Sequence, residues 1–307
     1  MRYIGIDISK SSFNVFIPPA GNYVFPNDAS GFSELLRLLV PEDIVGMEST
    51  GNYHQKLALF LWKEHFCVKI LNPIMVNQFI RSTVRKKKTD RSDAVIISKL
   101  VEQGEGYETT EKQLTNRIRK LTRTKQKLVQ QRTSLKILLK TTETDTADCS
   151  CIKKSFIRLI KNYDAEIQKL EKEILKTTST ESNILKSIPG ISALFACAIV
   201  GELGDISRFS RTKQIVAYAG LDPKISQSGH SVNRKGSLTK RGSSLLRQIL
   251  FLAAFANITR DTVFSRYYRK KRVEGKHYYQ AMTATSRKIL KVCFVLLKKQ
   301  EFFLDSP

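Results

Sequence analysis

Residues 2–17 read RYIGIDISKSSFNVFI and contain two short runs rich in β-branched and aromatic residues, joined by a polar turn. Two further runs, DIVGME at 43–48 and FCVKIL at 66–71, are preceded by helical patterns near 30–39 and 53–65. The first two runs are close enough to form a hairpin, whereas the helices before the later runs require crossover connections. The sequence therefore predicts a mixed sheet flanked by helices.

A third helix should begin near Arg91 and complete this first domain at about residue 104. Gly104 and Gly106 mark the break in the chain there. The resulting α/β layout of residues 1–104 is compatible with an RNase H-like fold.

The composition indicates a folded, strongly basic protein. Its 307 residues are 41% hydrophobic, which is enough for two domains with a connecting module between them. Lys and Arg number 52 against 28 Asp and Glu, for a formal net charge of +24. This excess predicts a polyanionic partner, most often a nucleic acid; a ribosome-associated role or an anionic membrane surface is the alternative.

The chain shows no secretory or membrane signal. Arg2 and Asp7 interrupt the apolar stretch that a signal peptide needs, and no run reaches the roughly 18 apolar residues of a membrane span. The five cysteines are scattered without C-x-x-C spacing, so neither a disulfide framework nor a zinc site is expected. A cytoplasmic location fits these features. The cysteines are Cys67, Cys149, Cys151, Cys197 and Cys293.

Residues 105–180 are expected to form a helical coiled-coil hairpin. Leucines recur every seven residues from Leu114 to Leu135, but Lys125 and Arg132 occupy the complementary positions, so only half of a coiled-coil seam is present. From Phe156 onward the apolar residues follow a regular 3-4 spacing. This hairpin is either an intramolecular spacer or a surface for dimerisation or RNA binding along Lys120, Arg123, Lys125, Lys127 and Arg132.

Residues 181–307 are expected to form a mainly helical third domain. SIPGISALFACAIVGELGD at 187–205 is typical of a hairpin of helices that grips a DNA backbone. A loop rich in Ser, Gly and cations follows at 224–243, and then two apolar helices at 244–258 and 280–298 surround the basic patch RYYRKKR, 266–272.

Four carboxylates are candidates for one metal site. Asp7 and Glu48 each end a predicted strand, and Asp90 and Asp93 lie three residues apart at a helix start in KKKTDRSDA. Mg²⁺ prefers oxygen ligands, and paired ions assist the breaking of phosphodiesters. Taken singly, each carboxylate has a structural explanation as a turn or helix-capping residue, so the prediction rests on the combination.

The segment ISQSGHSVNRKGSLTKRGSSLLR, 225–247, offers serine hydroxyls beside many cations. A serine in such surroundings can attack a phosphodiester, and Ser228 is the best placed. From the residues alone, a loop that grips phosphates is the favoured interpretation. His230 is set aside as a base, and Tyr218, Tyr267 and Tyr268 are expected to stack or pack rather than to act as nucleophiles.

Several motifs together resemble one known family. GIDISK, ESTGNYH, NPIMVNQFIRSTVRKKKTDRSDA, IPGIS with GDISRFS, and YAGLDPKISQSGH followed by RKGSLTKRGSSLLR occur in order over nearly the whole chain. They resemble the insertion-sequence-110 family, the DEDD transposases, which are related to Piv-type DNA invertases. The resemblance implies a RuvC-like domain, a coiled-coil segment and a C-terminal transposase domain.

The resemblance also implies a mechanism. The protein would be a site-specific recombinase of a mobile element, guided by a structured bridge RNA. Its carboxylates would be Asp7, Glu48, Asp90 and Asp93, with Mg²⁺ or Mn²⁺, and its nucleophile Ser228, with Ser226 and Ser231 as neighbouring alternatives. Candidate nucleic-acid contacts are Lys86, Lys87, Lys88, Arg123, Arg234, Lys235, Lys240 and Arg241.

The partners expected are the DNA of the element ends and the target, the guide RNA, and further copies of the chain in a dimer or tetramer, within the nucleoid of a bacterial or archaeal cell. Two enzymatic rivals remain, a hydrolytic RuvC-like nuclease and a Piv-like invertase. A third alternative is a decayed transposase that binds its own RNA or element ends without cutting DNA.

Overall fold

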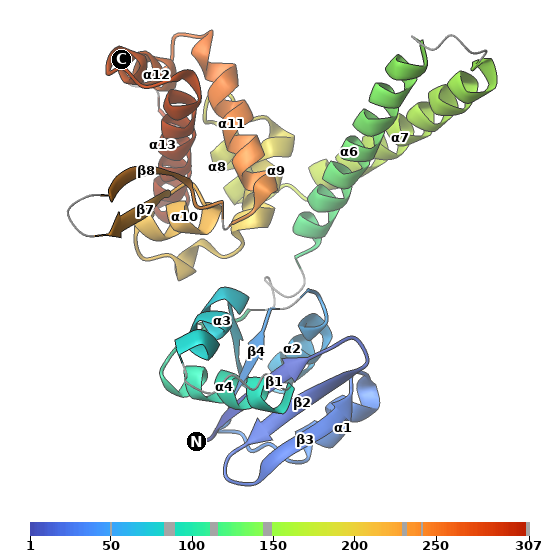
Figure 1. The fold of residues 1–307 in the computed structure, drawn as a ribbon, viewed down its shortest axis with the longest axis vertical. Coiled ribbons are helices and arrows are strands. Elements are labelled where there is room, and N and C mark those ends of the chain that lie inside the picture. The colour runs from blue at the N-terminus through green and yellow to red at the C-terminus, as the bar shows by residue number, and fades with distance from the viewer. Residues whose placement is uncertain are drawn as a thin grey trace. The chain divides into compact units, whose positions relative to one another are not determined.

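The chain divides into two compact units, Met1–Thr115 and Asn116–Pro307, which are described separately (Figure 1). The structure is a computed structural model. It describes residues 1–49, 51–82, 90–110, 116–143, 149–228, 232–240 and 242–304.

The first unit is built on a six-stranded mixed sheet in the order β3-β2-β1-β4-β5-β6. β1, β2 and β3 pair antiparallel, β4 and β5 continue from β1 in parallel, and β6 pairs antiparallel with β5. The predicted mixed sheet is thereby confirmed. The strands are β1 Tyr3–Ile8, β2 Ser12–Ile17, β3 Gly21–Pro26, β4 Ile44–Glu48, β5 Cys67–Leu71 and β6 Tyr107–Glu108.

Helices pack on both faces of this sheet. One face, with Ile6 and Met47, is buried beneath α1 and α2, whereas the other contacts α4, with α3 beside it. Strand residues alternate between the two faces, so successive residues of β1 and β4 enter different cores. The helices are α1 Ala29–Leu36, α2 His54–Lys63, α3 Pro73–Ser82 and α4 Asp90–Glu102.

Three elements of this unit were not predicted: β3, α3 and β6. β3 is an edge strand with exposed Asn22 and Val24, and it lacks the strong apolar signal of the central strands. β6 pairs only two residues with β5. Because β6 lies beyond Gly104 and Gly106, the unit extends to Thr115 rather than to the expected residue 104.

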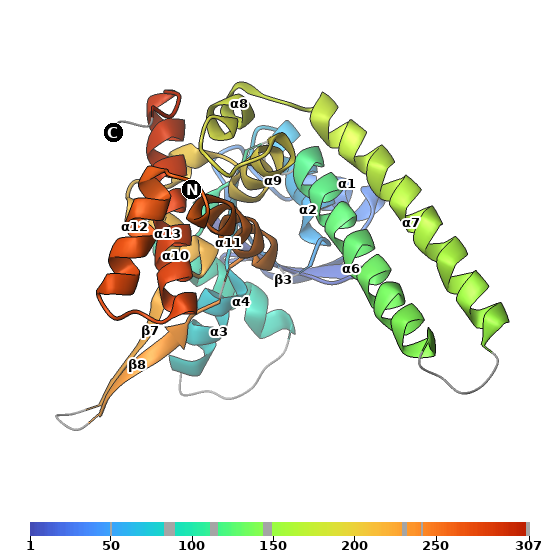
Figure 2. The same ribbon diagram turned by 90° about the horizontal axis from the view of Figure 1, so that it is seen from above.

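The second unit begins with the predicted helical hairpin, α6 Arg117–Glu143 and α7 Ser150–Lys176, and Figure 2 shows the two helices side by side. Lys125 and Arg132, which interrupt the leucine seam of α6, form ion pairs across it with Glu171 and Asp164 of α7. Ion pairs between α6 and α7 of the same chain thus take the place of the apolar contacts that are missing from the coiled-coil seam.

The rest of the second unit is a helical body around one large apolar core. The helix predicted at 244–258 has those bounds, and the helix predicted at 280–298 is one or two residues longer at each end. Within the described ranges, no helix is both long and apolar enough to cross a bilayer. The elements are α8 Thr180–Lys186, α9 Ala193–Leu203, the 3-10 helix η1 Ile206–Arg208, α10 Thr212–Ala219, α11 Ser244–Ile258, α12 Val263–Val273 and α13 Tyr278–Lys299.

The hairpin of helices predicted at 187–205 is shifted: this segment contains one α-helix, α9, and the helix that pairs with it, α8, lies before the segment at Thr180–Lys186. Pro189 and Gly190 lie in the connection rather than at the helix start, since α9 is capped by Ser192, whose side chain accepts from the Phe195 N–H. Gly204 ends α9 as expected, with a φ of 61° that favours glycine.

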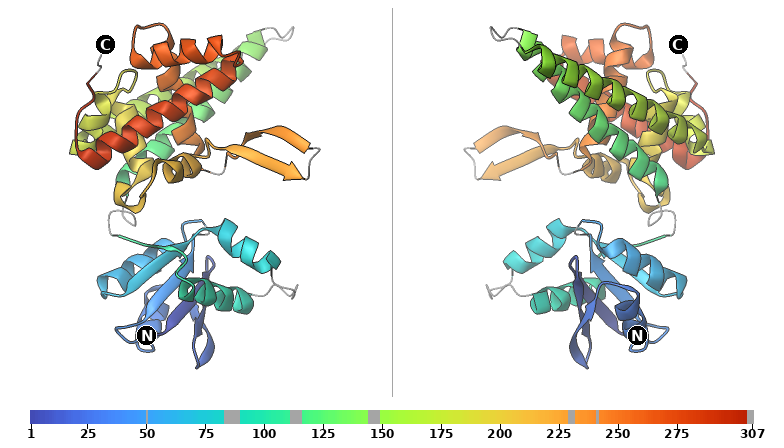
Figure 3. Two further views of the ribbon diagram at one scale, coloured as in Figure 1. Left: turned by 90° about the vertical axis from the view of Figure 1, so that its left-hand side faces the viewer. Right: turned by 90° about the vertical axis from the view of Figure 1, so that its right-hand side faces the viewer.

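The loop expected at 224–243 is instead largely a two-stranded antiparallel ribbon, β7 Pro223–Ser228 and β8 Val232–Leu238. Figure 3 shows this ribbon projecting from the helical body. The prediction failed because the ribbon is mostly polar, so no apolar alternation distinguishes its strands from a loop.

Candidate active site

Asp7 and Glu48 lie side by side at one edge of the sheet. β1 and β4 are parallel neighbours with Ile6 opposite Met47, so the next residue of each strand is a carboxylate. Ile6 and Met47 are fully buried in the core beneath α1 and α2. By strand alternation, the half-buried Asp7 and Glu48 lie toward the other face, which α4 covers.

The packing of α4 on β1 fixes the direction of this helix. Ser98 donates a 2.6 Å hydrogen bond to the Tyr3 carbonyl, whereas a Cβ added to Gly5 would lie 1.9 Å from the Ala94 carbonyl oxygen. From Tyr3 to Gly5 along β1, the contacts in α4 shift from Ser98 toward Ala94, so the helix runs in the direction opposite to the strand. The start of α4 therefore lies toward the end of β1 that carries Asp7.

Asp90 is the first residue of α4, and Asp93 follows one turn later, as the sequence predicted. The Asp93 side chain is half-buried, whereas Asp90 is described only in its backbone. The helix start thus contributes two acidic residues toward the edge where β1 and β4 end.

By donor chemistry this set fits a hard divalent cation, because all four residues are carboxylates. Among the described side chains, which exclude that of Asp90, no three carboxylate, thiol or imidazole groups lie close enough to hold a metal ion. The fit to Mg²⁺ or Mn²⁺ therefore rests on the kind of donor and on placement at one sheet edge.

His54 is a further residue near this edge that the sequence did not single out. It begins α2, which follows β4, and it is buried at 8% exposure. Burial lowers the pKa of its imidazole, which favours the neutral form. Within the described part of the chain, its Nδ1 has no hydrogen-bond partner.

Ser228 is the last residue of β7, where it pairs with Val232 across the ribbon. The neighbouring Ser226 pairs with Arg234, so this predicted cation is two register positions from Ser228. Ser231, the other alternative nucleophile, lies outside the described residues. The structure thus places the candidate serine at the far end of the ribbon.

Two arginines anchor the root of this ribbon. Arg287 of α13 donates from Nε and Nη2 to the Leu221 carbonyl at 3.1 and 2.6 Å. Arg247 of α11 donates from one nitrogen to the carbonyls of Ala219 and Gly242 at 3.1 and 2.7 Å. Both chain segments that enter the ribbon are thereby tied to the helical body.

Close backbone packing tightens the same root. A Cβ added to Gly242 would lie 1.8 Å from the Tyr218 carbonyl oxygen, so only glycine fits without a shift. Thr239 donates to the Asp222 carboxylate at 2.6 Å, which joins the two strand ends. These contacts set the direction in which the ribbon leaves the body.

The predicted nucleic-acid contacts have different surroundings. Lys240 is exposed and has a φ of 52°, two residues after the end of β8. Arg123 donates to both oxygens of the fully buried Glu202 carboxylate at 2.6 and 2.9 Å, which raises the arginine pKa. Arg234 and Lys235 belong to β8 and are described only in their backbone, and Lys86, Lys87, Lys88 and Arg241 lie outside the described residues.

Three of the five cations proposed for the hairpin surface are thus used inside the chain. Arg123 pairs with Glu202, Lys125 with Glu171 and Arg132 with Asp164. This arrangement favours the hairpin as an intramolecular element. Lys120 and Lys127, both exposed, are the other two.

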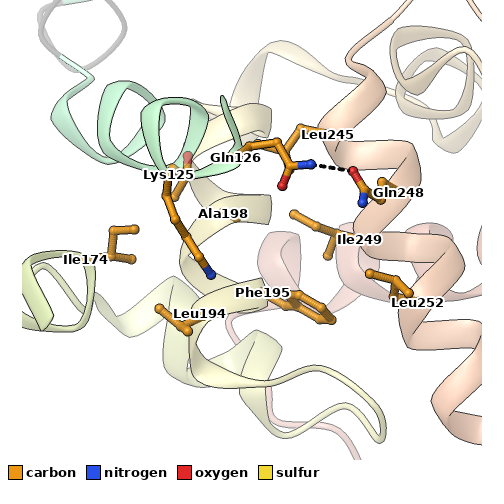
Figure 4. Close-up of a pocket in the computed structure, with 11 residues that line it drawn as sticks. Lys125, Gln126, Ile174, Leu194, Phe195, Ala198, Leu245, Gln248, Ile249 and Leu252 are labelled. Carbon is orange, nitrogen blue, oxygen red and sulfur yellow. Dashed lines mark hydrogen bonds between the residues drawn. The ribbon is translucent and has the colours of Figure 1, made fainter. Parts of the chain in front are cut away.

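A small hollow lies where the hairpin meets α9 and α11 (Figure 4). Its wall is mostly apolar, with Phe195 and Leu252 among the lining residues, and Gln126 donates a 2.9 Å hydrogen bond to Gln248 across it. The hollow lies at a packing joint and does not include any of the candidate catalytic residues.

Comparison with known proteins places these features in a family. A family model of DEDD transposases of the IS110 type matches residues 4–142, and a second model, Transposase IS116/IS110/IS902 family, matches residues 182–269. The chain belongs to the IS110 family of transposases. The two matched ranges contain the four candidate carboxylates and Ser228, respectively.

Relatives of this IS110-family transposase include two proteins of similar length. The pilin gene-inverting proteins of Moraxella bovis and Moraxella lacunata are each 26% identical over 98% of this chain and 97% of their own length. The transposase for insertion sequence element IS1111A of Coxiella burnetii is 29% identical over 46% of this chain and 40% of that protein. The predicted enzyme class, a DNA transposase or recombinase, is confirmed.

Proposed function

We propose that this IS110-family transposase is an RNA-guided, site-specific DNA recombinase of a mobile insertion element, with an RNase H-like domain of the RuvC kind at its N-terminus. One observation carries the proposal. Asp7, the penultimate residue of β1, and Glu48, the last residue of β4, lie at the same end of adjacent parallel strands, and α4 begins with Asp90 and Asp93 toward that edge.

The carboxylates Asp7, Glu48, Asp90 and Asp93 would hold the divalent cation. Mg²⁺ or Mn²⁺ bound there would neutralise the charge that develops on a phosphodiester during its cleavage. The sheet holds Asp7 and Glu48 at fixed neighbouring positions, so a phosphate at this edge would meet a preorganised set of acidic groups.

Ser228 is the proposed nucleophile. Its hydroxyl oxygen forms a bond to a DNA phosphorus while the bond from that phosphorus to one deoxyribose oxygen breaks, and the hydroxyl proton passes to the departing oxygen. The products are a free DNA hydroxyl and a phosphoserine ester. Attack on this ester by a hydroxyl from another strand reverses the exchange and releases the serine, so no external energy source is required.

Guidance by RNA would explain how the protein selects a site. Phosphate contacts from a chain of net charge +24 bind nucleic acid strongly but carry no sequence information. Base pairing with a guide RNA would supply that information, as in other RNA-guided systems. Joining two DNA sites would need a dimer or tetramer.

A second candidate function is DNA inversion. The Moraxella proteins, whose names describe inversion of a pilin gene, align with nearly the whole chain. Inversion would use the same carboxylates and the same serine on two sites within one molecule, so the arrangement of the DNA sites and not the residues would separate the two functions.

A cleavage assay tests the serine chemistry. The full chain is mixed with Mg²⁺, RNA transcribed from the flank of its element, and DNA carrying the matching sites. We expect a protein-linked DNA band on a denaturing gel that requires the RNA and disappears in Ser228→Ala. Ser226→Ala and Ser231→Ala are the matched controls, and they should keep the band.

The other outcomes point elsewhere. A band that survives Ser228→Ala would move the nucleophile to another residue. Cleavage without a band would favour a hydrolytic nuclease in which water attacks. Binding without any cleavage would favour a decayed transposase that only holds nucleic acid, and cleavage without RNA would contradict the guidance.

A further inference from the structure

Helix α12 carries a dense group of cations that the proposed active site does not use. Residues 260–276 contain seven Lys and Arg but only two acidic residues, Asp261 and Glu274. Arg266, Arg269 and Lys270 are exposed on the helix. Since residues three or four apart lie on the same side of a helix, these three form one cationic stripe.

A second feature brings more positive charge to the same helix. The ammonium groups of Lys271 and of Lys288 from α13 lie 5.2 and 4.5 Å from the centre of the Tyr267 ring. α12 and α13 lie side by side (Figure 2). Two lysines from neighbouring helices thus converge on one ring, where cation–π attraction holds their ammonium groups.

Structural roles account for some of these cations but not for all. Lys271 pairs with Glu274 at 2.8 Å and Arg266 with Asp261 at 3.5 Å, and cations in the last turn of a helix interact favourably with its dipole. Arg269 precedes that last turn, and neither it nor Lys270 forms an ion pair with a described carboxylate. Arg269 and Lys270 are therefore exposed cations that no described ion pair neutralises.

We propose that this α12 cationic face, formed by Arg266, Arg269 and Lys270 with Lys271 and Lys288 beside Tyr267, binds the sugar-phosphate backbone of a nucleic acid. Phosphates along this face pair with its exposed cations, and the bound strand releases counterions. The face lies on helices outside the carboxylate edge and outside the ribbon, and it goes beyond the proposed function.

The chemistry of the face indicates how it would act. Lys and Arg contacts to phosphate fix the position of a duplex but do not distinguish bases. The α12 cationic face should therefore hold DNA or RNA of any sequence. DNA of the recombination sites and the guide RNA share this backbone chemistry, and the experiment separates the two sources.

The test compares two triple variants of the full chain. Arg266→Ala, Arg269→Ala and Lys270→Ala remove the stripe, whereas Lys161→Ala, Lys169→Ala and Lys176→Ala remove three exposed cations of α7 and change the net charge equally. Binding to a duplex DNA of arbitrary sequence and to the flanking RNA is measured over a range of salt. Far-UV circular dichroism and thermal melting check that both variants fold.

We expect the α12 triple to reduce the slope of log K against log salt by about 2 to 3, close to one per lost phosphate contact, and the α7 triple to change it much less. An effect on DNA alone or on RNA alone supports the face and identifies its source. Equal effects of the two triples would overturn the proposal, because net charge alone would then explain the loss. This binding measurement does not require DNA cleavage, so its outcome does not depend on whether Ser228 is the nucleophile.

Discussion

The proposed carboxylates and the proposed serine nucleophile are held in opposite ways, each within its own unit. Asp7 and Glu48 belong to strands with neighbours on both sides and helices on both faces, so the sheet fixes their spacing. Ser228 ends a ribbon whose two strands pair only with each other, and two-stranded ribbons are marginal by themselves. The carboxylate geometry is thus a property of the whole fold, whereas the serine depends on the few contacts at the ribbon root.

The largest effect should come from the carboxylates themselves. We expect Asp7→Asn or Glu48→Gln to reduce recombination by on the order of 10³-fold or more, because a neutral amide is a poor ligand for a divalent cation. The measurement is recombination of a two-site plasmid reporter, together with RNA binding. Binding should persist, and Glu42→Gln, an exposed residue just before β4, is the control. Loss of RNA binding in step with activity would indicate a structural role instead.

The next effect concerns how closely α4 lies on the sheet. A Cβ at Gly5 would meet backbone atoms of Ala94 and Ser98, at 1.9 and 2.5 Å, whereas at Gly46 the nearest atom is a Val101 methyl at 2.3 Å. We expect Gly5→Ala to lower the free energy of unfolding by about 3 kcal/mol and to displace the acidic helix start, and Gly46→Ala to cost less because a side chain can move. Chemical denaturation measures both, and equal costs would contradict this difference.

A smaller effect is expected at the ribbon root. Arg287→Ala removes both donors to the Leu221 carbonyl, and we expect the cleavage rate to fall about ten- to a hundredfold while DNA affinity stays unchanged. Arg287→Lys, which keeps one donor, should recover part of the rate. Lys291→Ala, an exposed neighbour on α13, is the control. A loss of affinity without a loss of rate would show that Arg287 contacts nucleic acid rather than positioning the ribbon.

The smallest effect is a pH dependence confined to the sheet unit. Burial lowers the pKa of His54 in the folded state below its ordinary value of 6.5, so the unfolded chain binds a proton more readily. Stability should therefore fall as the pH drops from about 7 through the ordinary histidine pKa toward the lower folded value. Thermal melting at pH 7 and pH 5 checks this, and His54→Leu should flatten the dependence. An unchanged slope in that variant would assign the titration to another group.

Much of the sheet unit was predictable because its central strands are buried. β1, β2, β4 and β5 contain apolar runs, and strands that end together bring their last residues together, which predicted the neighbouring positions of Asp7 and Glu48. β6 and the β7–β8 ribbon were missed because one is too short and the other too polar to give a periodic signal.

The contacts that hold the ribbon could not be predicted from sequence for a different reason. Arg287 is 66 residues from Leu221, and its acceptor is a backbone carbonyl that every residue type possesses. The half seam of α6 was visible, but its completion required knowing that Lys125 and Arg132 face Glu171 and Asp164. Patterns along the chain report burial, whereas specific polar partners emerge only in the folded structure.

The ion pair between exposed Arg123 and the buried Glu202 carboxylate joins the base of the α6–α7 hairpin to α9. Arg123 lies near the start of α6, and the 20 residues from there to Glu143 extend about 30 Å at 1.5 Å per residue. A rotation of about 10° at this joint would move the far end by roughly 5 Å, which is nearly one helical turn. A small change in the packing of α9 against α6 would therefore cause a larger displacement at the far end of the hairpin, in proportion to the length of α6.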